Sequence, residues 1–163
     1  YVDKDGEKLS INWLTYPTRL EQPKLAEYAQ ATLKDIGIDV QVNNTSDHRT
    51  FAENGDFDVY VSSTTTAPTG DPEYFFTSTV VGSKNYGKYQ NDEVTKLTDE
   101  LHQTFDKDER GKLAVELQQD ILDDDAFFFV SHLNMGIVTK SNVKGMAAHP
   151  CDYYEITADL DVE

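Results

Sequence analysis

The stretch LSINWLTYPTRLEQPKLAEYAQATLKDIGIDVQVNNTSDHRTFAENGDFDVYV, residues 9–61, decides the fold of this chain. Within it, apolar and polar side chains alternate over residues 9–13, 38–43 and 57–61. An alternation with period two is the pattern of a strand that buries one of its faces. We therefore expect three strands in this stretch.

Helices are expected between these strands. Pro23 suits the first position of a helix, and Gly37 suits the position just after its end. The apolar side chains expected on one face of this helix are Leu25, Tyr28, Ala29, Leu33 and Ile36. A short helix running through Phe51 is expected before the third strand. The order β-α-β-α-β predicts an α/β fold with a parallel sheet and right-handed crossovers.

The second half of the chain is predicted to be more helical. Asn91 is expected to cap one helix, and Asp106 with Glu109 has the spacing of a capping box that opens the next. The side chains expected to face inward are Val94, Leu97, Leu101 and Phe105, then Leu113, Leu117 and Ile121. Further strands are expected at residues 127–133, 135–138 and 153–163. We find no linker or internal repeat, so residues 1–163 are expected to form a single domain.

Composition excludes several classes of function. Thirty Asp and Glu against fourteen Lys and Arg give a formal net charge of −16. A field of this sign repels phosphate backbones and anionic lipids, which argues against nucleic acid or a membrane surface as the partner. No apolar run approaches the roughly 20 residues of a membrane span. The first residues lack the features of a signal peptide, so any targeting segment is expected upstream, in a longer parent protein.

A ligand site is expected at the carboxyl ends of the parallel strands, where open α/β sheets bind their ligands. The loop after the first strand carries Tyr16 and Arg19, and the loop after the third carries Thr64, Thr65 and Thr66. Hydroxyl groups suit hydrogen bonding to a small polar ligand, and a guanidinium suits a carboxylate. Alternatively, Arg19 pairs with nearby Glu21 or covers the start of the helix.

Two polar residues further along are weaker candidates. His132 and Asn134 share one face of an expected strand, opposite Leu133, and each is a candidate to point into a cleft. A satisfied structural histidine is the commoner alternative. The pair Asp71-Pro72 follows the threonine-rich loop, and we interpret it as a helix start rather than as a charge-binding site.

No catalytic or metal constellation is evident. The loops lack a nucleophile paired with a base, and the chain has no GxSxG, Gly-rich phosphate loop or CxxC motif. His149 and Cys151 are close in sequence, but two such residues are too few for a zinc site. The single cysteine also excludes an internal disulfide. We therefore expect no catalytic residues, no protein-held metal and no cofactor.

Several segments, collinear along nearly the whole chain, resemble the C-terminal lobe of the peptide/nickel class (family 5) of solute-binding proteins of ABC importers. The segments are PKLAEYAQ at 23–30, LKDIGIDV at 33–40, GDFD at 55–58, GDP at 70–72 with FF at 75–76, NDEV at 91–94, DER at 108–110, QQDIL at 118–122 and AFFFV at 126–130.

This resemblance implies a periplasmic-binding-protein-like lobe, one half of a two-lobe trap that closes on its ligand. It implies an extracytoplasmic protein, either a cell-surface lipoprotein or periplasmic. It also implies a monomer that delivers cargo to a membrane permease driven by ATPases, and no enzymatic activity.

The resemblance leaves the cargo open between two kinds of ligand. Residues 66–72 and 132–138 are similar to nickel-type members of Gram-positive bacteria, which take the metal with a small organic chelator. The histidine by which some nickel binders ligate the metal has no counterpart in residues 77–89. Dipeptide-type members use an acid before Gly-Asp-Pro that is missing here, although Arg19 fits their carboxylate-binding arginine. A nickel–chelator complex is thus the first hypothesis, a di- or oligopeptide the second and a hydrolase a distant third.

Overall fold

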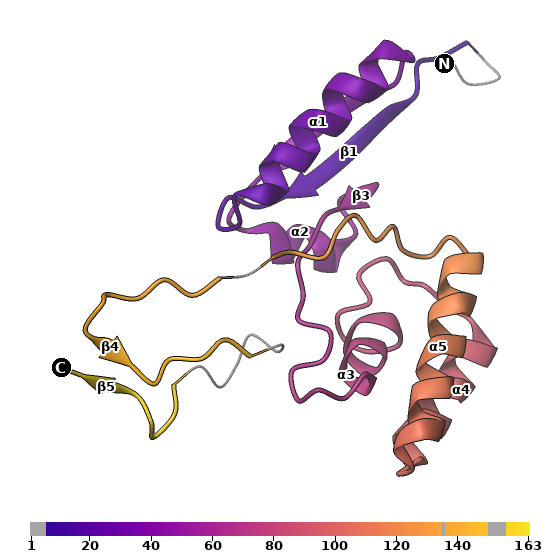
Figure 1. Ribbon diagram of the computed structural model, residues 1–163. Coiled ribbons are helices and arrows are strands. Elements are labelled where there is room, and N and C mark those ends of the chain that lie inside the picture. Colours follow the sequence, from indigo (N-terminus) through magenta and orange to yellow (C-terminus); the bar gives the residue numbers. More distant parts are fainter. Residues whose placement is uncertain (1–5, 135, 150–155) are drawn as a thin grey trace. The chain divides into compact units, whose positions relative to one another are not determined.

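The computed structural model describes residues 6–134, 136–149 and 156–163 of the chain (Figure 1). The backbone forms two compact units, residues 1–64 and residues 65–163, and each has its own buried side chains. That the two units act together as one domain stays a prediction.

The first unit is a three-stranded parallel sheet with two helices (Figure 1). Its elements are β1 (Ser10–Thr15), α1 (Glu21–Asp35), β2 (Asp39–Asn44), α2 (His48–Asn54) and β3 (Val59–Tyr60). Strand β1 lies in the centre, paired along its whole length with β2 and over two residues with β3. The β-α-β-α-β order and the α/β fold predicted from the sequence are therefore confirmed.

The end of α1 follows directly from its sequence. Gly37 adopts a φ of 83°, in the left-handed region that glycine enters without steric cost. The N–H of Gly37 donates to the carbonyl of Lys34, and the N–H of Ile38 donates to that of Leu33, each at 3.0 Å. These two bonds form a Schellman motif, so the predicted helix stop is confirmed.

The buried face of α1 differs from the predicted one. The helix begins at Glu21, two residues before the expected start, and its two buried side chains are Gln22 and Ala26. Tyr28 and Ile36, which were expected to face inward, are exposed. The other three predicted residues, Leu25, Ala29 and Leu33, are half-buried, so the predicted face is shifted rather than absent.

The second unit packs short helices around one apolar core. Its helices are α3 (Glu73–Phe75), the π-helical turn η1 (Phe76–Val80), α4 (Asp92–Gln103) and α5 (Lys107–Asp123). The core consists of Phe75, Phe76, Val80, Val94, Leu97, Leu101, Ala114, Leu117 and Ile121. Phe105 was expected to join it but is 93% exposed, because α4 ends at Gln103 and Thr104 turns to an extended conformation.

Asn91 and Asp106 cap their helices as predicted, but the capping box of Asp106 with Glu109 forms only its Asp106 half. Asn91 Oδ1 accepts hydrogen bonds from the N–H groups of Glu93 (2.9 Å) and Val94 (3.2 Å) at the start of α4. Asp106 Oδ1 accepts from those of Asp108 (3.1 Å) and Glu109 (3.0 Å) at the start of α5. The Glu109 side chain pairs with Lys112 one turn later.

After α5, fewer residues form strands than the sequence predicts. Residues 127–134 and 136–138 contain no strand, because none of the described segments pairs with their backbone, and residue 135 lies outside the described residues. In the expected tail strand, β5 (Asp161–Val162) pairs antiparallel with β4 (Val143–Lys144), while residues 153–155 lie outside the described residues. None of the described helices is long and apolar enough to span a membrane.

Candidate ligand-binding site

The carboxyl ends of the three parallel strands bring together Tyr16, His48 and Tyr60. Tyr16 directly follows β1, His48 opens α2 after β2, and Tyr60 ends β3. The Tyr16 and His48 rings stack with centroids 4.1 Å apart and an interplanar angle of 21°. His48 Nδ1 is hydrogen-bonded to the Tyr60 hydroxyl at 2.7 Å. We call these three residues the strand-end cluster.

The cluster also fixes the beginning of the loop after β3. The N–H of Ser63 donates to the Tyr16 hydroxyl at 3.2 Å. The buried Gln22 amide, in the orientation that satisfies both its ends, donates to the Val61 carbonyl at 3.2 Å and accepts from the Ser63 N–H at 3.3 Å. The threonine-rich loop therefore leaves the sheet from a defined position.

Thr15, the last residue of β1, lies next to this cluster in the chain. Its side-chain oxygen is buried and has no hydrogen-bond partner among the described residues. A buried hydroxyl without a partner costs about 1–3 kcal/mol.

The surroundings of His48 favour the neutral form of its ring. Burial lowers its pKa below the ordinary value, and the positive charge of Arg49 lowers it further, while Asp47 acts in the opposite direction. A neutral imidazole with Nδ1 bonded to Tyr60 keeps Nε2 as its second polar atom, and the tautomer decides whether that atom donates or accepts. Tyr16 is buried, with only 7% of its surface exposed, so the half-buried side chains of His48 and Tyr60 are the parts of the cluster that a ligand could reach.

Of the predicted site residues in the first unit, the structure places Tyr16 in the strand-end cluster. Arg19 is exposed in the loop between β1 and α1, and its guanidinium has no hydrogen-bond or ion-pair partner within the described ranges. The alternative pairing with Glu21 is therefore not formed. Thr64 is exposed one residue after Ser63. Ligand binding by these residues stays a prediction.

The remaining predicted residues belong to the second unit. Thr65 is half-buried and Thr66 is exposed. His132 and Asn134 are exposed, and the strand on whose face they were expected to align is not formed. A ligand role for these four residues also stays a prediction. Of the two residues considered for a zinc site, His149 is exposed and Cys151 lies outside the described residues.

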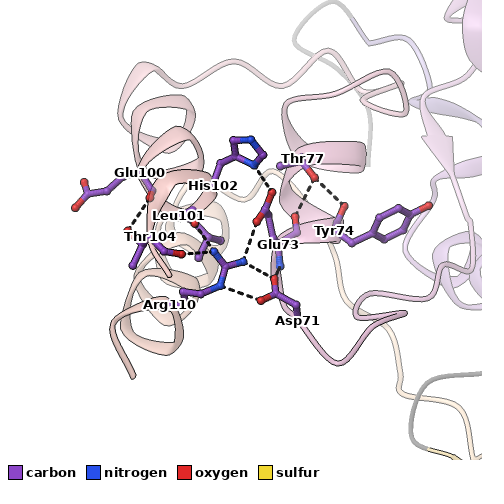
Figure 2. Close-up of polar contacts among 9 residues, drawn as sticks. All are labelled: Asp71, Glu73, Tyr74, Thr77, Glu100, Leu101, His102, Thr104 and Arg110. Carbon is purple, nitrogen blue, oxygen red and sulfur yellow. Dashed lines mark hydrogen bonds and ion pairs between the residues drawn. The ribbon is translucent and has the colours of Figure 1, made fainter. Parts of the chain in front are cut away.

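A second polar constellation surrounds Arg110 (Figure 2). The predicted helix start is present, although α3 begins at Glu73 with Pro72 rather than Asp71 in the N-cap position. Asp71 Oδ1 accepts a hydrogen bond from the N–H of Glu73 at 2.9 Å. Arg110 pairs with both Asp71 and Glu73, and Glu73 Oε1 lies 2.6 Å from His102 Nδ1. Hydrogen bonds from Arg110 hold the pKa of both carboxyl groups below their ordinary values. We call these four residues the Arg110 network.

Sequence reasoning did not single out His48, Tyr60 or Arg110. His48 follows the end of β2 by four residues, and Tyr60 is the last residue of β3. The strand-end rule, applied also to the loop after the second strand, would have found His48, whereas Tyr60 lies within the strand that the sequence predicted. The role of Arg110 depends on contacts 37 to 39 residues distant in the chain, for which the sequence carries no local signal. Across the described residues, no three His, Cys, Asp or Glu side chains converge to hold a metal ion.

Comparison with known proteins identifies the family. The model of the bacterial extracellular solute-binding proteins, family 5 middle region, matches residues 1–87. The chain belongs to this family. The match covers the whole first unit and the start of the second, and it confirms the resemblance drawn from the sequence.

The names of two curated relatives indicate two different cargoes. The chain is 26% identical to the nickel-binding protein NikA of Staphylococcus aureus over 167 residues, which covers 98% of this chain and 34% of the relative. It is 27% identical to the oligopeptide-binding protein AppA of Bacillus subtilis over 161 residues, which covers 95% of this chain and 30% of the relative. The chain spans about a third of the length of these relatives.

A solved structure supports the assignment of the fold. The chain superimposes on the nickel ABC transporter protein of Bacillus halodurans with a TM-score of 0.73 and 32% identity, covering 98% of this chain and 34% of that one. The fold is therefore that of a family 5 solute-binding protein, and the similarity extends through both units.

Proposed function

We propose that this chain is the C-terminal lobe of the substrate-binding component of an ABC importer, with nickel in complex with a small organic chelator as its cargo. The observation that most supports a binding role is the strand-end cluster, in which Tyr16, His48 and Tyr60 converge where open α/β sheets bind ligands. The half-buried His48 and Tyr60 side chains add aromatic surface and neutral hydrogen-bonding groups, which suit the outer surface of a small organic complex.

The proposed contacts are divided between charge and hydrogen bonding. The exposed guanidinium of Arg19 would bind a carboxylate of the chelator, since its planar fork matches that group. The hydroxyls of Thr64, Thr65 and Thr66 and the side chains of His132 and Asn134 would add hydrogen bonds. In this proposal the metal takes its ligands from the chelator, and the remaining part of the full-length protein supplies the other wall of the site.

We rank nickel first among the candidate cargoes because two of the similar proteins are named as nickel proteins, and one of them is 32% identical to this chain. A di- or oligopeptide is the second candidate, because AppA is an oligopeptide-binding protein at similar identity. Arg19 would then bind the terminal carboxylate of the peptide. The two cargoes differ in whether binding requires metal.

Calorimetric titration of the full-length protein tests this proposal. Three ligand solutions are compared: nickel with two equivalents of L-histidine, nickel alone, and a mixture of short peptides without metal. We expect saturable binding of the nickel–histidine mixture and much weaker binding of the other two. Binding of peptides alone would contradict the nickel proposal and support the second candidate.

Arg19→Ala tests the carboxylate contact, with Lys24→Ala as the matched control. Lys24 is an exposed cation on α1 and changes the net charge equally. Loss of a charge-assisted hydrogen bond costs about 1.5–3 kcal/mol, so affinity should fall at least tenfold in Arg19→Ala and remain unchanged in the control. Equal affinity in both variants would count against the contact.

The same role implies where the protein works and with which partners. The family is extracellular, and we propose either a lipid-anchored position on the cell surface or a periplasmic location. We further propose that the full-length protein is a monomer that docks on a permease driven by ATPases.

A further inference from the structure

Arg110 lies in the first turn of α5, and its side chain is only 14% exposed. Figure 2 shows its guanidinium between the start of α3 and the end of α4. Nε donates to Asp71 Oδ2 at 2.9 Å, and Nη2 donates to Asp71 Oδ1 at 2.6 Å and to Glu73 Oε2 at 2.8 Å. Nη1 donates to the carbonyls of Leu101 at 2.5 Å and Thr104 at 2.6 Å.

These contacts use the whole hydrogen-bonding capacity of the group. A guanidinium has five N–H donors, and each of the five has a partner. Each oxygen of the two facing carboxylates also has a partner, since Glu73 Oε1 is bonded to His102. Arg110 would have to release a partner before it could bind a ligand anion, so its chemistry here is that of a structural anchor.

The anchored segment is the end of the threonine-rich loop. Asp71 is the residue at which that loop enters α3, and its Oδ1 also accepts the N–H of Glu73. Just before it, Gly70 adopts a φ of 79° and closes a turn by donating to the carbonyl of Ala67 at 3.0 Å. Two carboxylate oxygens, a turn and a helix start thus depend on a single guanidinium that is itself bound to the end of α4.

We infer that Arg110 is a positioning residue for ligand binding: by fixing Asp71 to the corner between α4 and α5, it holds residues 65–70 in their binding conformation without touching cargo. This inference rests on the proposed function, in which that loop contacts the ligand. Lysine cannot replace arginine here, because an ammonium group has three donors and no planar fork.

The test uses the full-length protein and two measurements. Hydrogen exchange of the peptide covering residues 65–70 reports on the loop in the absence of ligand, and titration with the nickel–histidine mixture and with peptides reports on affinity. The variants are Arg110→Lys and Asp71→Asn, so that the test remains available if Arg110→Ala fails to fold. Lys112→Ala is the surface control, because Lys112 forms an exposed ion pair within the same helix.

Ile121→Val is a second control, which destabilises the unit through its core without changing the network. We expect Arg110→Lys to speed exchange of the loop at least tenfold and to weaken affinity at least fivefold, while both controls leave loop exchange and affinity unchanged. Unchanged loop exchange in Arg110→Lys and Asp71→Asn would overturn the inference, as would faster exchange with unchanged affinity. A wild-type protein that binds neither ligand would overturn the proposed function, and loop exchange would still decide whether Arg110 anchors the loop.

Discussion

His48 combines three kinds of interaction in one half-buried side chain. Its ring stacks on Tyr16, its Nδ1 is bonded to Tyr60, and burial lowers its pKa. Because the folded protein disfavours the protonated ring, His48 couples the stability of the strand-end cluster to pH. The coupling has a definite sign, since the pKa is lower in the folded than in the unfolded state.

We expect the free energy of unfolding to fall as the pH drops from about 7 toward 5. The unfolded state binds a proton near the ordinary histidine pKa of about 6.5 while folded His48 does not, so stability is lost over this range. His48→Phe keeps a stacking ring and should reduce this pH dependence, at a cost of about 1 kcal/mol at pH 7 for the lost hydrogen bond. Urea denaturation at each pH measures both effects. The exposed His149→Gln should keep the wild-type slope, and an unchanged slope in His48→Phe would contradict this account.

Because of the Arg110 network, we expect a second loss of folding stability at a more acidic pH than the one due to His48. Hydrogen bonds from Arg110 lower the pKa of Asp71 and Glu73. Their contribution to stability is complete above the unfolded-state values of about 4 and is lost as the pH falls through the lower folded-state values. Thermal melts between pH 5 and 2 should show a steeper loss for the wild-type protein than for Asp71→Asn. If the melting temperatures of the two proteins fell in parallel with pH, the ion pairs of Arg110 would contribute little to folding stability.

At the scale of the elements, helix ends are where the sequence determines the structure most directly. Gly37, Asn91 and Asp106 each end or begin a helix through bonds to backbone groups within a few residues. Such signals are local, so they were predictable. The buried face of α1 and the position of Phe105 were not, because both depend on where a helix begins or stops relative to a neighbouring element.

Replacing two glycines by alanine should change the free energy of unfolding in opposite directions. Gly111 lies inside α5, and a Cβ added there would meet no atom within 4 Å. Gly111→Ala should therefore stabilise the protein by about 0.5–1 kcal/mol. Gly37→Ala should destabilise it by about 1–2 kcal/mol, because its φ of 83° is unfavourable for alanine. Guanidinium denaturation of the two variants measures the difference, and a loss of stability in Gly111→Ala would refute the first expectation.

The candidate site was predictable only in part, because some of its contacts join residues that are far apart in the chain. Tyr16 and the threonine-rich loop follow from the order of the strands, which alternating side chains define. His48 joins the cluster through an aromatic stack, and Arg110 reaches Asp71 across 39 residues. No spacing rule covers either contact. Residues 127–134 and 136–138 form no strand, because a strand requires a pairing partner as well as a suitable sequence.

At the scale of the whole molecule, charge is the dominant property. A formal net charge of −16 over 163 residues makes the compact state repel itself. Raising the ionic strength from 0.01 M to 0.5 M shortens the screening length from about 30 Å to less than 8 Å. The melting temperature should therefore rise by several degrees with sodium chloride, as calorimetry would show. A melting temperature that falls with salt would indicate that ion pairs such as those of Arg110 outweigh the repulsion.

The order of strands in the first unit also has a consequence for how the molecule reaches its native state. Strands β1 and β2 are joined by one helix and pair along six residues, whereas β3 pairs with β1 over only two residues, Val59 and Tyr60, and from much further along the chain. Closing the shorter sequence separation costs less chain entropy, so β1, α1 and β2 should form the folding nucleus and β3 should dock late. Mutations in β3 should accordingly change the unfolding rate more than the folding rate. Because Tyr60 belongs to β3, we expect the strand-end cluster to be completed only when β3 docks.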